Sequence, residues 1–419
     1  MDSKKRLQED ALEIIRYAIQ ENLPDRALRK ALSEKPLPGP LTLIAIGKAA
    51  WRMAKTGVDC LGSKITDGIV LTKYGYSEGP LPRIEIFEAG HPLTDENSIF
   101  ATQTILDRVR TSPESQRILF LLSGGGSSLF ELPVSGLGLN DLKEVNDHLL
   151  KSGASIHEIN AVRKRLSEVK GGRFARLAYP RPISAFILSD TLGDRIDNVA
   201  SGPVSVDQTT SKEAFAVLRK YSLNLPQHIL YAMERGSPEA LPGVEAAIIG
   251  NVRYLCRAAG KKAQQLGYSA LSLTTQFDGT AAECAKMLTL VGKEIASSEL
   301  PVSSPAAVFI GGEAVVHVRG KGKGGRCQEM ALLASKEIAR WDRLCFFACG
   351  SDGTDGPTDA AGGMATGDTI TRLEEKGLNL ESFLQNNNSH EALKAVDGLI
   401  VTGPTGTNVN DLYGVLVGK

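Results

Sequence analysis

Short runs of branched and aromatic apolar residues recur along the chain, and most of them end in glycine. Examples are LTLIAIG at 41–47, RILFLLSGGG at 117–126, AAVFIGG at 306–312 and LCFFACG at 344–350. Strands that are buried on both faces of a parallel sheet show this continuous apolar character, whereas half-exposed strands alternate. Segments with helical periodicity separate several of the runs. The pattern predicts an α/β fold whose ligand-binding loops follow the carboxyl ends of the strands.

The chain is long enough for two domains, since 419 residues exceed what one hydrophobic core usually supports. A polar, proline-containing stretch at 221–243 precedes the strand-like run EAAIIGN at 245–251. We place the boundary there, which gives an N-terminal domain of residues 1–240 and a C-terminal domain of residues 241–419. Two alternatives stay open: the last segment packs back on the first domain, and the irregular ELPVSSP at 299–305 is either a second boundary or a loop.

Charge and hydropathy argue against several classes of partner. Lys plus Arg and Asp plus Glu both total 48, so no net field attracts nucleic acid or an anionic membrane surface. The first thirty residues contain no apolar signal-peptide core, and no stretch approaches the roughly twenty apolar residues of a membrane span. Six scattered cysteines fit a reducing compartment. We therefore expect a soluble cytoplasmic protein without nucleic-acid or membrane partners.

The strongest local signal is a serine and glycine loop directly after the apolar run RILFLL, formed by Ser123, Gly124, Gly125, Gly126, Ser127 and Ser128. Three consecutive glycines let backbone N–H groups approach an anion without interference from Cβ atoms, and the serines add hydroxyl donors. The loop predicts a phosphate site, with a tight strand exit as the structural alternative. It is not a Walker A loop, because no Gly-Lys-Ser or Gly-Lys-Thr follows.

Two further glycine turns place a cation at the predicted start of a helix. Lys321, Lys323 and Arg326 lie in the glycine-rich loop before the helical run CQEMALLASKEIAR, and Lys48 follows Gly47 after the run LTLIAI. A cation at a helix N-terminus opposes the helix dipole unless an anion compensates it. The two turns therefore predict anion sites, although a solvated turn would also explain the lysines. The Gly47 turn lacks the spaced glycines of a dinucleotide fingerprint.

Two acidic loops also follow strand-like runs. One contains Asp190 and Asp194 after PISAFIL, and the other contains Asp352 and Asp355 after LCFFAC. Carboxylates at strand ends commonly hold magnesium together with water and phosphate oxygens, whereas Asx turns would explain some of these aspartates structurally. His91, which precedes a proline at a predicted strand end, is expected to be structural, and no Gly-x-Ser-x-Gly pattern supports an esterase triad.

Eight segments, in this order, resemble the successive motifs of the glycerate 2-kinase family, whose C-terminal portion is called the MOFRL domain: IGKAAWRMA, AGHPLTDENS, LLSGGGSSLFELP, INAVRKRLSEVKGGRFA, ILSDTLGDRIDNVASGP, GGEAVVHVRGKGKGGRCQEMAL, GSDGTDGPTDAAGG and GPTGTNVNDLYG. The resemblance runs from about residue 10 to the C-terminus. One departure is Arg165 in VRKRLS, which stands where family members usually carry histidine.

The resemblance implies a larger, Rossmann-like doubly wound N-terminal domain and a smaller C-terminal α/β domain of the MOFRL type. It also implies transfer of the γ-phosphoryl group of ATP to the 2-hydroxyl group of glycerate, with Mg²⁺ or a similar divalent cation, in a cleft between the domains. Whether such a chain forms a homodimer is left open. The glycine loops, isolated cations and acidic strand ends supply the parts that phosphoryl transfer needs.

We assign roles to these residues as a hypothesis. Lys48 and Arg326 neutralise charge during transfer, and Asp190 accepts the hydroxyl proton, with Glu313 as the reserve candidate. The remaining assignments are ATP binding by the 123–128 loop with Lys321 and Lys323, glycerate binding by Glu313 and Asp194, and metal binding by Asp190, Asp352 and Asp355.

Two other functions are kept as alternatives. One is an NAD(P)-dependent hydroxypyruvate reductase, a name that has been attached to relatives of this family; the missing spaced-glycine fingerprint and ribose-binding acid count against it. The other is an anion-binding or regulatory α/β protein that has lost turnover. Oxidation of NADH by hydroxypyruvate, or ATP binding without ADP release, would distinguish them from a kinase.

Overall fold

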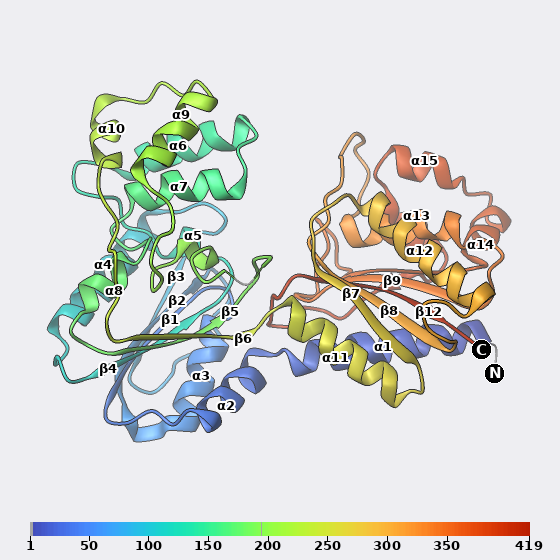
Figure 1. Ribbon diagram of the computed structural model, residues 1–419, viewed down its shortest axis with the longest axis horizontal. Helices are drawn as coiled ribbons and strands as arrows, with labels where there is room; N and C mark the ends of the chain where they lie inside the picture. The colour runs from blue at the N-terminus through green and yellow to red at the C-terminus, as the bar shows by residue number, and fades with distance from the viewer. Residues whose placement is uncertain (1–2, 194) are drawn as a thin grey trace. The chain divides into compact units, whose positions relative to one another are not determined.

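The computed structural model describes residues 3–193 and 195–419. The chain forms two compact units (Figure 1). Ala27–Ile249 form the first unit, and Gly250–Lys419 form the second unit together with the N-terminal segment up to Arg26. Each unit has its own sheet and its own hydrophobic core. Helices alternate with strands through most of both units, which confirms the expected α/β class.

The first unit is built on a sheet with the strand order β3-β2-β1-β4-β5-β6. Its strands are β1 (Leu41–Ile46), β2 (Ile65–Lys73), β3 (Ile84–Ala89), β4 (Arg117–Leu122), β5 (Ile183–Leu188) and β6 (Val244–Gly250). The pairs β2–β3, β1–β2, β1–β4 and β4–β5 are parallel. This order is that of the Rossmann-type doubly wound fold, in which the winding reverses between β1 and β4. The Rossmann-like architecture is therefore confirmed.

Alternate residues of β1 pack against opposite helical layers. Ile44 and Ile46 belong to one hydrophobic cluster, whereas Leu43 and Ala45 belong to the other. The strand is thus buried on both faces, which is why its sequence is apolar throughout instead of alternating. The surrounding helices and 3₁₀ turns are α2 (Pro24–Glu34), α3 (Ala50–Leu61), η1 (Gly62–Lys64), α4 (Glu96–Thr111), α5 (Gly126–Leu129), α8 (Arg173–Ala178) and η2 (Val199–Ser201).

A separate helical group with its own core belongs to the first unit and is drawn in green in Figure 1. It consists of α6 (Leu139–Lys151), α7 (Ile156–Leu166), α9 (Ser211–Lys220) and α10 (Gln227–Met233). The stretch 221–243, expected to be a domain boundary, contains α10 and then leads into β6. The run EAAIIGN therefore completes the first sheet, because its apolar residues pair beside β5, and the units divide at 249/250 instead of 240/241.

The second unit contains a mixed sheet with the order β11-β10-β9-β12-β8-β7. Its strands are β7 (Ser269–Phe277), β8 (Ala306–Gly312), β9 (Leu344–Gly350), β10 (Gly362–Thr366), β11 (Leu399–Ile400) and β12 (Asp411–Val417). β7 and β8 are parallel, whereas β12 is antiparallel to both β8 and β9, and β10 is antiparallel to β9 and β11. Parallel strands were expected here. A strand that is buried on both faces is apolar whichever way it runs, so the sequence does not reveal its direction.

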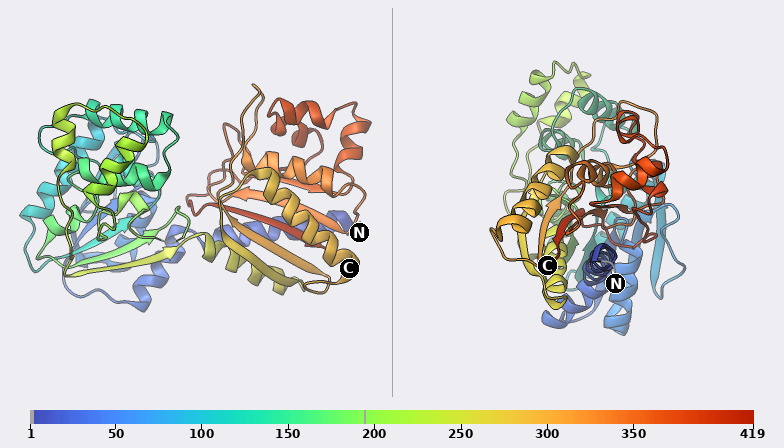
Figure 2. Two further views of the ribbon diagram at one scale, coloured as in Figure 1. Left: turned by 45° about the horizontal axis from the view of Figure 1, so that its top comes forward. Right: turned by 90° about the vertical axis from the view of Figure 1, so that its right-hand side faces the viewer.

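Helices cover both faces of this second sheet (Figures 1 and 2). One face carries α12 (Ala281–Ser298), α13 (Arg326–Glu337), α14 (Thr369–Glu375), α15 (Leu380–Gln385) and α16 (Ser389–Ala395), and the other carries α1 (Ser3–Glu21) and α11 (Val252–Gln265). The N-terminal helix α1 joins this unit because Leu7, Ala11 and Ile14 are buried on one side of it. The last strand, β12, is likewise part of this sheet and not of the first domain. Among the described residues, no helix is long and apolar enough to cross a membrane.

Candidate active site

The loops after β1 and β4 are joined by hydrogen bonds, at the point between these two strands where the strand order of the first sheet reverses. The Lys48 N–H donates to the Gly124 carbonyl (2.9 Å), and the Ala49 N–H donates to the Ser123 hydroxyl (3.0 Å). Gly47 has a φ of +118°, and a Cβ atom there would lie 2.3 Å from Oγ of Ser123, so only glycine fits this turn. Ligands of doubly wound folds bind at this reversal. The two turns predicted from separate motifs therefore form one candidate site.

Three side chains surround the glycines of this loop. A Cβ atom at Gly124 would lie 2.2 Å from Oδ2 of Asp190. A Cβ atom at Gly125 would lie 3.0 Å from Cδ2 of His91 and 3.3 Å from Cγ of Lys48. All three side chains belong to half-buried residues, so they are accessible to a ligand without being loose on the surface. The structure thus brings Lys48 and Asp190 to the serine and glycine loop and adds His91.

His91 follows β3 and lies beside the glycine loop, and its expected structural role stays a prediction. Burial and the neighbouring charges of Lys48 and Lys73 lower the pKa of His91 to about 4, so its imidazole is neutral at pH 7. A neutral imidazole can donate one hydrogen bond and accept another beside the loop. The signal that could have found His91 is its place after a strand, because the carboxyl ends of parallel strands meet at one edge of a sheet.

A buried ion pair anchors the far side of the loop. Nζ of Lys170 donates to the carbonyl oxygens of Ser127 (2.8 Å) and Phe130 (3.2 Å) and to Oε2 of Glu131 (2.6 Å). Burial lowers the pKa of Lys170, and the adjacent Glu131 carboxylate opposes that shift. Sequence reasoning missed this pair, since its members lie in different motifs and neither follows a strand.

Arg165 lies in a buried ion cluster of the helical group. Its Nη2 donates to Oδ2 of Asp207 (2.6 Å) and its Nη1 donates to the Ser237 hydroxyl (2.8 Å). Lys164 donates to Oδ1 of the same aspartate (3.1 Å). Arg165 therefore ties α7 to the segments that flank α9 and α10. Asp194, predicted to bind glycerate, lies outside the described residues.

In the second unit, Arg326 begins α13 and is held by two carboxylates. Its Nε and Nη2 donate to Oδ2 (2.6 Å) and Oδ1 (3.2 Å) of Asp411, and its Nη1 donates to Oε1 of Glu313 (2.9 Å). Burial raises the pKa of Asp411 to about 6, although Arg326 and the Tyr413 hydroxyl both favour its ionised form. The anion expected to compensate Arg326 is thus a carboxylate of the protein. Asp411 was not predicted from the sequence.

The aspartates of the loop after β9 stabilise the loop and the adjoining helix. Asp355 is buried and accepts hydrogen bonds from the N–H groups of Cys327 (3.1 Å) and Gln328 (2.8 Å), which begin α13. Oδ1 of Asp352 accepts from the N–H (2.9 Å) and the hydroxyl (3.0 Å) of Thr354, as in an Asx turn. Within residues 3–193 and 195–419, no group of three or more His, Cys, Asp and Glu side chains could hold a metal by itself.

The lysine-containing loop before α13 is clamped by asparagines. The N–H of Lys321 donates to Oδ1 of Asn386 (3.0 Å), and the N–H of Lys323 donates to Oδ1 of Asn388 (3.0 Å). Amide oxygens thus take the place that an anion was predicted to occupy at these backbone N–H groups. The lysine residues themselves are exposed. The asparagine run gave no sign of this contact in the sequence, because nothing in its composition identifies a partner so distant along the chain.

The residues around the 123–128 loop combine the groups that a phosphate-transfer site requires. Backbone N–H groups and serine hydroxyls can bind phosphate oxygens, and Lys48 adds a positive charge beside them. Asp190 supplies a carboxylate that can accept a proton or contribute to a divalent cation. These groups favour the binding of a phosphate group and its transfer.

Comparisons with known proteins identify relatives along almost the whole chain. Residues 10–234 match the family described as a domain of unknown function (DUF4147), and residues 306–411 match the MOFRL family. The chain is 47% identical to the D-glycerate 2-kinase of Thermotoga maritima, covering 96% of each sequence. It is 41% identical to the glycerate 2-kinase of Pyrococcus horikoshii, covering 98% of this chain and 97% of that one. The crystal structure of the Thermotoga maritima glycerate kinase superposes with a TM-score of 0.95 at 46% identity, over 99% of this chain and 100% of that one.

Proposed function

Because the chain belongs to the glycerate 2-kinase family, we propose that it transfers the γ-phosphoryl group of ATP to the 2-hydroxyl group of glycerate and releases ADP and 2-phosphoglycerate. The observation that best supports this proposal is the joined pair of loops at the reversal of the first sheet. There, the 123–128 loop offers donors for phosphate, and Lys48 and Asp190 lie directly beside it.

We assign the steps of the reaction to these residues. The backbone N–H groups and hydroxyls of the 123–128 loop bind the phosphates of ATP, and Lys48 balances the charge of the transferring group. The 2-hydroxyl oxygen of glycerate attacks the γ-phosphorus while the bond to the oxygen that bridges the β- and γ-phosphates breaks. The hydroxyl proton passes to the carboxylate of Asp190 late in a loose transition state. ADP leaves with the electron pair of the broken bond.

A magnesium ion fits the donor set if phosphate oxygens complete its coordination. Mg²⁺ typically uses one or two protein carboxylates and takes its other ligands from water and phosphate. Asp190 beside Gly124 can be such a ligand, and Asp352 keeps a partly exposed carboxylate that remains a candidate. Asp355, the third predicted ligand, is already engaged with the start of α13. When bound, the ion would screen the negative charge of ATP from that of glycerate.

Arg326 is proposed to bind an anionic group of the substrates by exchanging Glu313 for it. Asp411 fixes the inner side of the guanidinium with two hydrogen bonds and is buried. The outer nitrogen, Nη1, pairs with Glu313, whose side chain is 49% exposed. Exposed ion pairs contribute only about 0–1 kcal/mol, so a carboxylate or phosphate can replace this one at little cost. In the absence of substrate, the Glu313 carboxylate thus occupies the position on Arg326 that the anionic group would take. Lys321 and Lys323 remain predicted contacts of the phosphate groups of ATP.

Hydroxypyruvate reduction is the second candidate activity. The strand order of the first sheet is shared with dinucleotide-binding enzymes, so the fold alone is compatible with NADH. The turn after β1, however, contains the single Gly47 followed by Lys48, and it lacks the spaced glycines that admit a pyrophosphate. We therefore rank the kinase first.

An ADP-release assay over a panel of short hydroxy acids tests the proposal. ADP should form with glycerate and magnesium, and Asp190→Asn should abolish most of this turnover while the protein stays folded. Robust NADH oxidation with hydroxypyruvate, or ATP binding without ADP release, would replace the kinase by one of the alternatives. The position of the active site in a cleft between the domains stays a prediction of the sequence analysis.

A further inference from the structure

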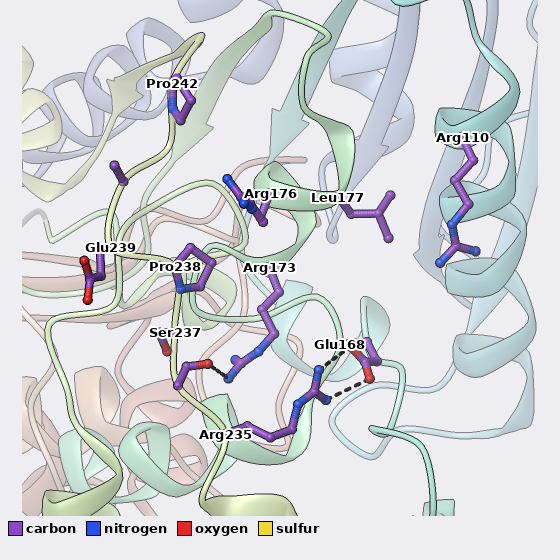
Figure 3. Close-up of a pocket in the computed structure, with 12 residues that line it drawn as sticks. Arg110, Glu168, Arg173, Arg176, Leu177, Arg235, Ser237, Pro238, Glu239 and Pro242 are labelled. Carbon is purple, nitrogen blue, oxygen red and sulfur yellow. Dashed lines mark hydrogen bonds and ion pairs between the residues drawn. The ribbon is translucent and has the colours of Figure 1, made fainter.

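A cavity in the first unit, of about 900 Å³, contains none of the residues discussed around the glycine loop (Figure 3). It is formed by the end of α4, by α8 with the preceding Glu168, and by the segment that connects α10 to β6. The side chains that matter for its chemistry are Arg110, Glu168, Arg173, Arg176, Arg235 and Glu239. Its volume lies within the range of about 300–1,000 Å³ that is typical of small-molecule sites.

The charged lining of this cavity is predominantly positive. It carries four arginines and two glutamates. Arg235 donates to both oxygens of Glu168 (2.8 and 3.1 Å), so these two charges balance each other. Figure 3 shows the carboxylate of Glu239 turned away from the arginine side chains. Arg110, Arg173 and Arg176 therefore give the lining its excess of positive charge, although Arg110 is also paired with Asp107, which is not part of the lining.

Arg173 forms a fixed, buried part of the wall. Its side chain is 8% exposed, and its Nη2 donates to the carbonyl oxygen of Gly236 (3.0 Å), which links α8 to the connecting segment. Burial, together with repulsion from Arg235 and Arg165, lowers the pKa of Arg173 to about 10. The Asp207 and Glu168 carboxylates oppose this shift, so the positive charge of Arg173 is only partly compensated by acidic side chains.

The two other arginines are available to a ligand. Arg110 pairs with Asp107 (2.9 Å), and both side chains are more than half exposed, so this pair is weak. Arg176 is exposed, and no ion pair or hydrogen bond of its side chain is recorded within the described part of the chain. Each lies in the last turn of a helix, where the dipole favours a cation. That preference explains each arginine singly, but it does not explain why arginines from three segments line one cavity.

We propose that this cavity binds a small organic anion with at least two negative charges, either a phosphate ester or a polycarboxylate. Guanidinium groups bind the oxygens of phosphate and carboxylate in pairs, which matches a wall with several arginines. Leu177, Pro238, Ala240 and Pro242 form an apolar part of the remaining wall, which fits a compact carbon skeleton. The site is separate from the phosphate loop, and its occupancy does not depend on the proposed kinase reaction.

Isothermal titration of the full chain with glycerol 3-phosphate, a small phosphate ester, and, separately, with citrate, a polycarboxylate, tests the proposal. The test variant is Arg110→Ala/Arg176→Ala, and the matched control is Arg219→Ala, which removes an exposed arginine from α9 of the same unit. The wild type and the control should bind one more equivalent of the anion than the double variant, or should bind the anion with an affinity about tenfold or more higher than that of the double variant. The probe that binds identifies the class of anion.

Bound anion should also raise the melting temperature of the wild type and the control more than that of the double variant. Kinase activity measured without added anion should be the same in all three proteins, because none of the altered arginines lies at the glycine loop. Equal binding of both probes by all three proteins, or no binding of either probe by the wild type at millimolar concentration, would overturn the proposal. Failure of the kinase reaction would leave this result unaffected.

Discussion

Lys48 is positioned at the glycine loop by its backbone, so its side chain can be changed without altering the turn. Its N–H bonds to Gly124, while its side chain extends beside Gly125. We predict that Lys48→Met folds normally and lowers kcat by about 10³-fold, on the scale of losing a charge that stabilises a transferring phosphoryl group. Lys55→Met, which removes an exposed lysine within α3, is the control. A kcat of Lys48→Met close to the wild-type value would remove Lys48 from the mechanism.

His91 gives the folded protein a defined dependence on pH. Its pKa in the folded chain, about 4, lies below the value of 6.5 expected for the unfolded chain. As the pH falls from 6.5 toward 4, the unfolded state binds the proton first, so the free energy of unfolding decreases. Above pH 6.5, the imidazole is neutral in both states and contributes no pH dependence. Between pH 6.5 and 4, urea unfolding should show a smaller loss of the free energy of unfolding for His91→Gln than for the wild type. The prediction is refuted if this free energy changes with pH equally in both proteins.

The sequence predicted candidate site residues where a local rule applied, and it gave no sign of contacts that depend on a distant partner. Lys48 was predicted as a cation at a helix start and Asp190 as a carboxylate at a strand end, and both lie beside the serine and glycine loop. His91 obeys the same rule, but its low pKa depends on burial and on Lys48, which no local pattern shows. Asp411 matters in this account because the fold places its carboxylate beside Arg326. This carboxylate compensates the positive charge of Arg326 at the start of α13.

At the scale of elements, the end of α5, which follows the glycines of the 123–128 loop, is held by Lys170. We predict that Lys170→Met lowers the free energy of unfolding by about 3–5 kcal/mol, because it leaves the charge of Glu131 buried and unpaired. Lys170→Met/Glu131→Gln should recover much of this stability. It should still show a raised KM for ATP, since the donors to Ser127 and Phe130 remain absent. Full recovery of KM in the double variant would show that the lysine serves stability alone.

The start of α13 allows a second test at this scale. Glu313→Ala should change the free energy of unfolding by less than about 1 kcal/mol, because the Glu313–Arg326 pair is exposed. It should leave the KM for glycerate unchanged or lowered, since the substrate no longer competes with Glu313. Arg326→Lys should lose most of kcat, because lysine cannot make paired contacts. A raised KM in Glu313→Ala would instead make this carboxylate a direct ligand of glycerate.

The elements themselves were largely visible in the sequence, but their partners were not. Apolar runs such as LTLIAI became strands because burial on both faces demands that composition. The same composition serves antiparallel strands, so the mixed second sheet was not predicted. Gly414 of β12 illustrates the missing information: a Cβ atom there would lie 2.5 Å from the ring of Phe347 on the neighbouring strand, a contact that only the fold reveals. The run EAAIIGN likewise belongs to the first sheet because β6 lies beside β5, and this strand neighbour is known only from the fold.

For the whole molecule, the balance of 48 basic and 48 acidic residues leaves no net field to attract ATP or glycerate. Binding of these anions must then depend on local groups, and the two units provide them differently. The first unit offers a glycine loop with Lys48, and the second offers Arg326 between two carboxylates. The account predicts that ionic strength affects substrate binding only modestly, because these charges are partly buried and poorly screened.

Phosphorus NMR of the product formed from ATP and glycerate tests the central claim most directly. A phosphate on carbon 2 is coupled to one methine proton, so its proton-coupled signal is a doublet. A phosphate on carbon 3 is coupled to two methylene protons, and its signal is a triplet. The account predicts the doublet, together with ADP in an amount equal to that of the phosphorylated product. In Asp190→Asn, both the doublet and the formation of ADP should be lost. A triplet, or consumption of ATP that yields only inorganic phosphate, would contradict it.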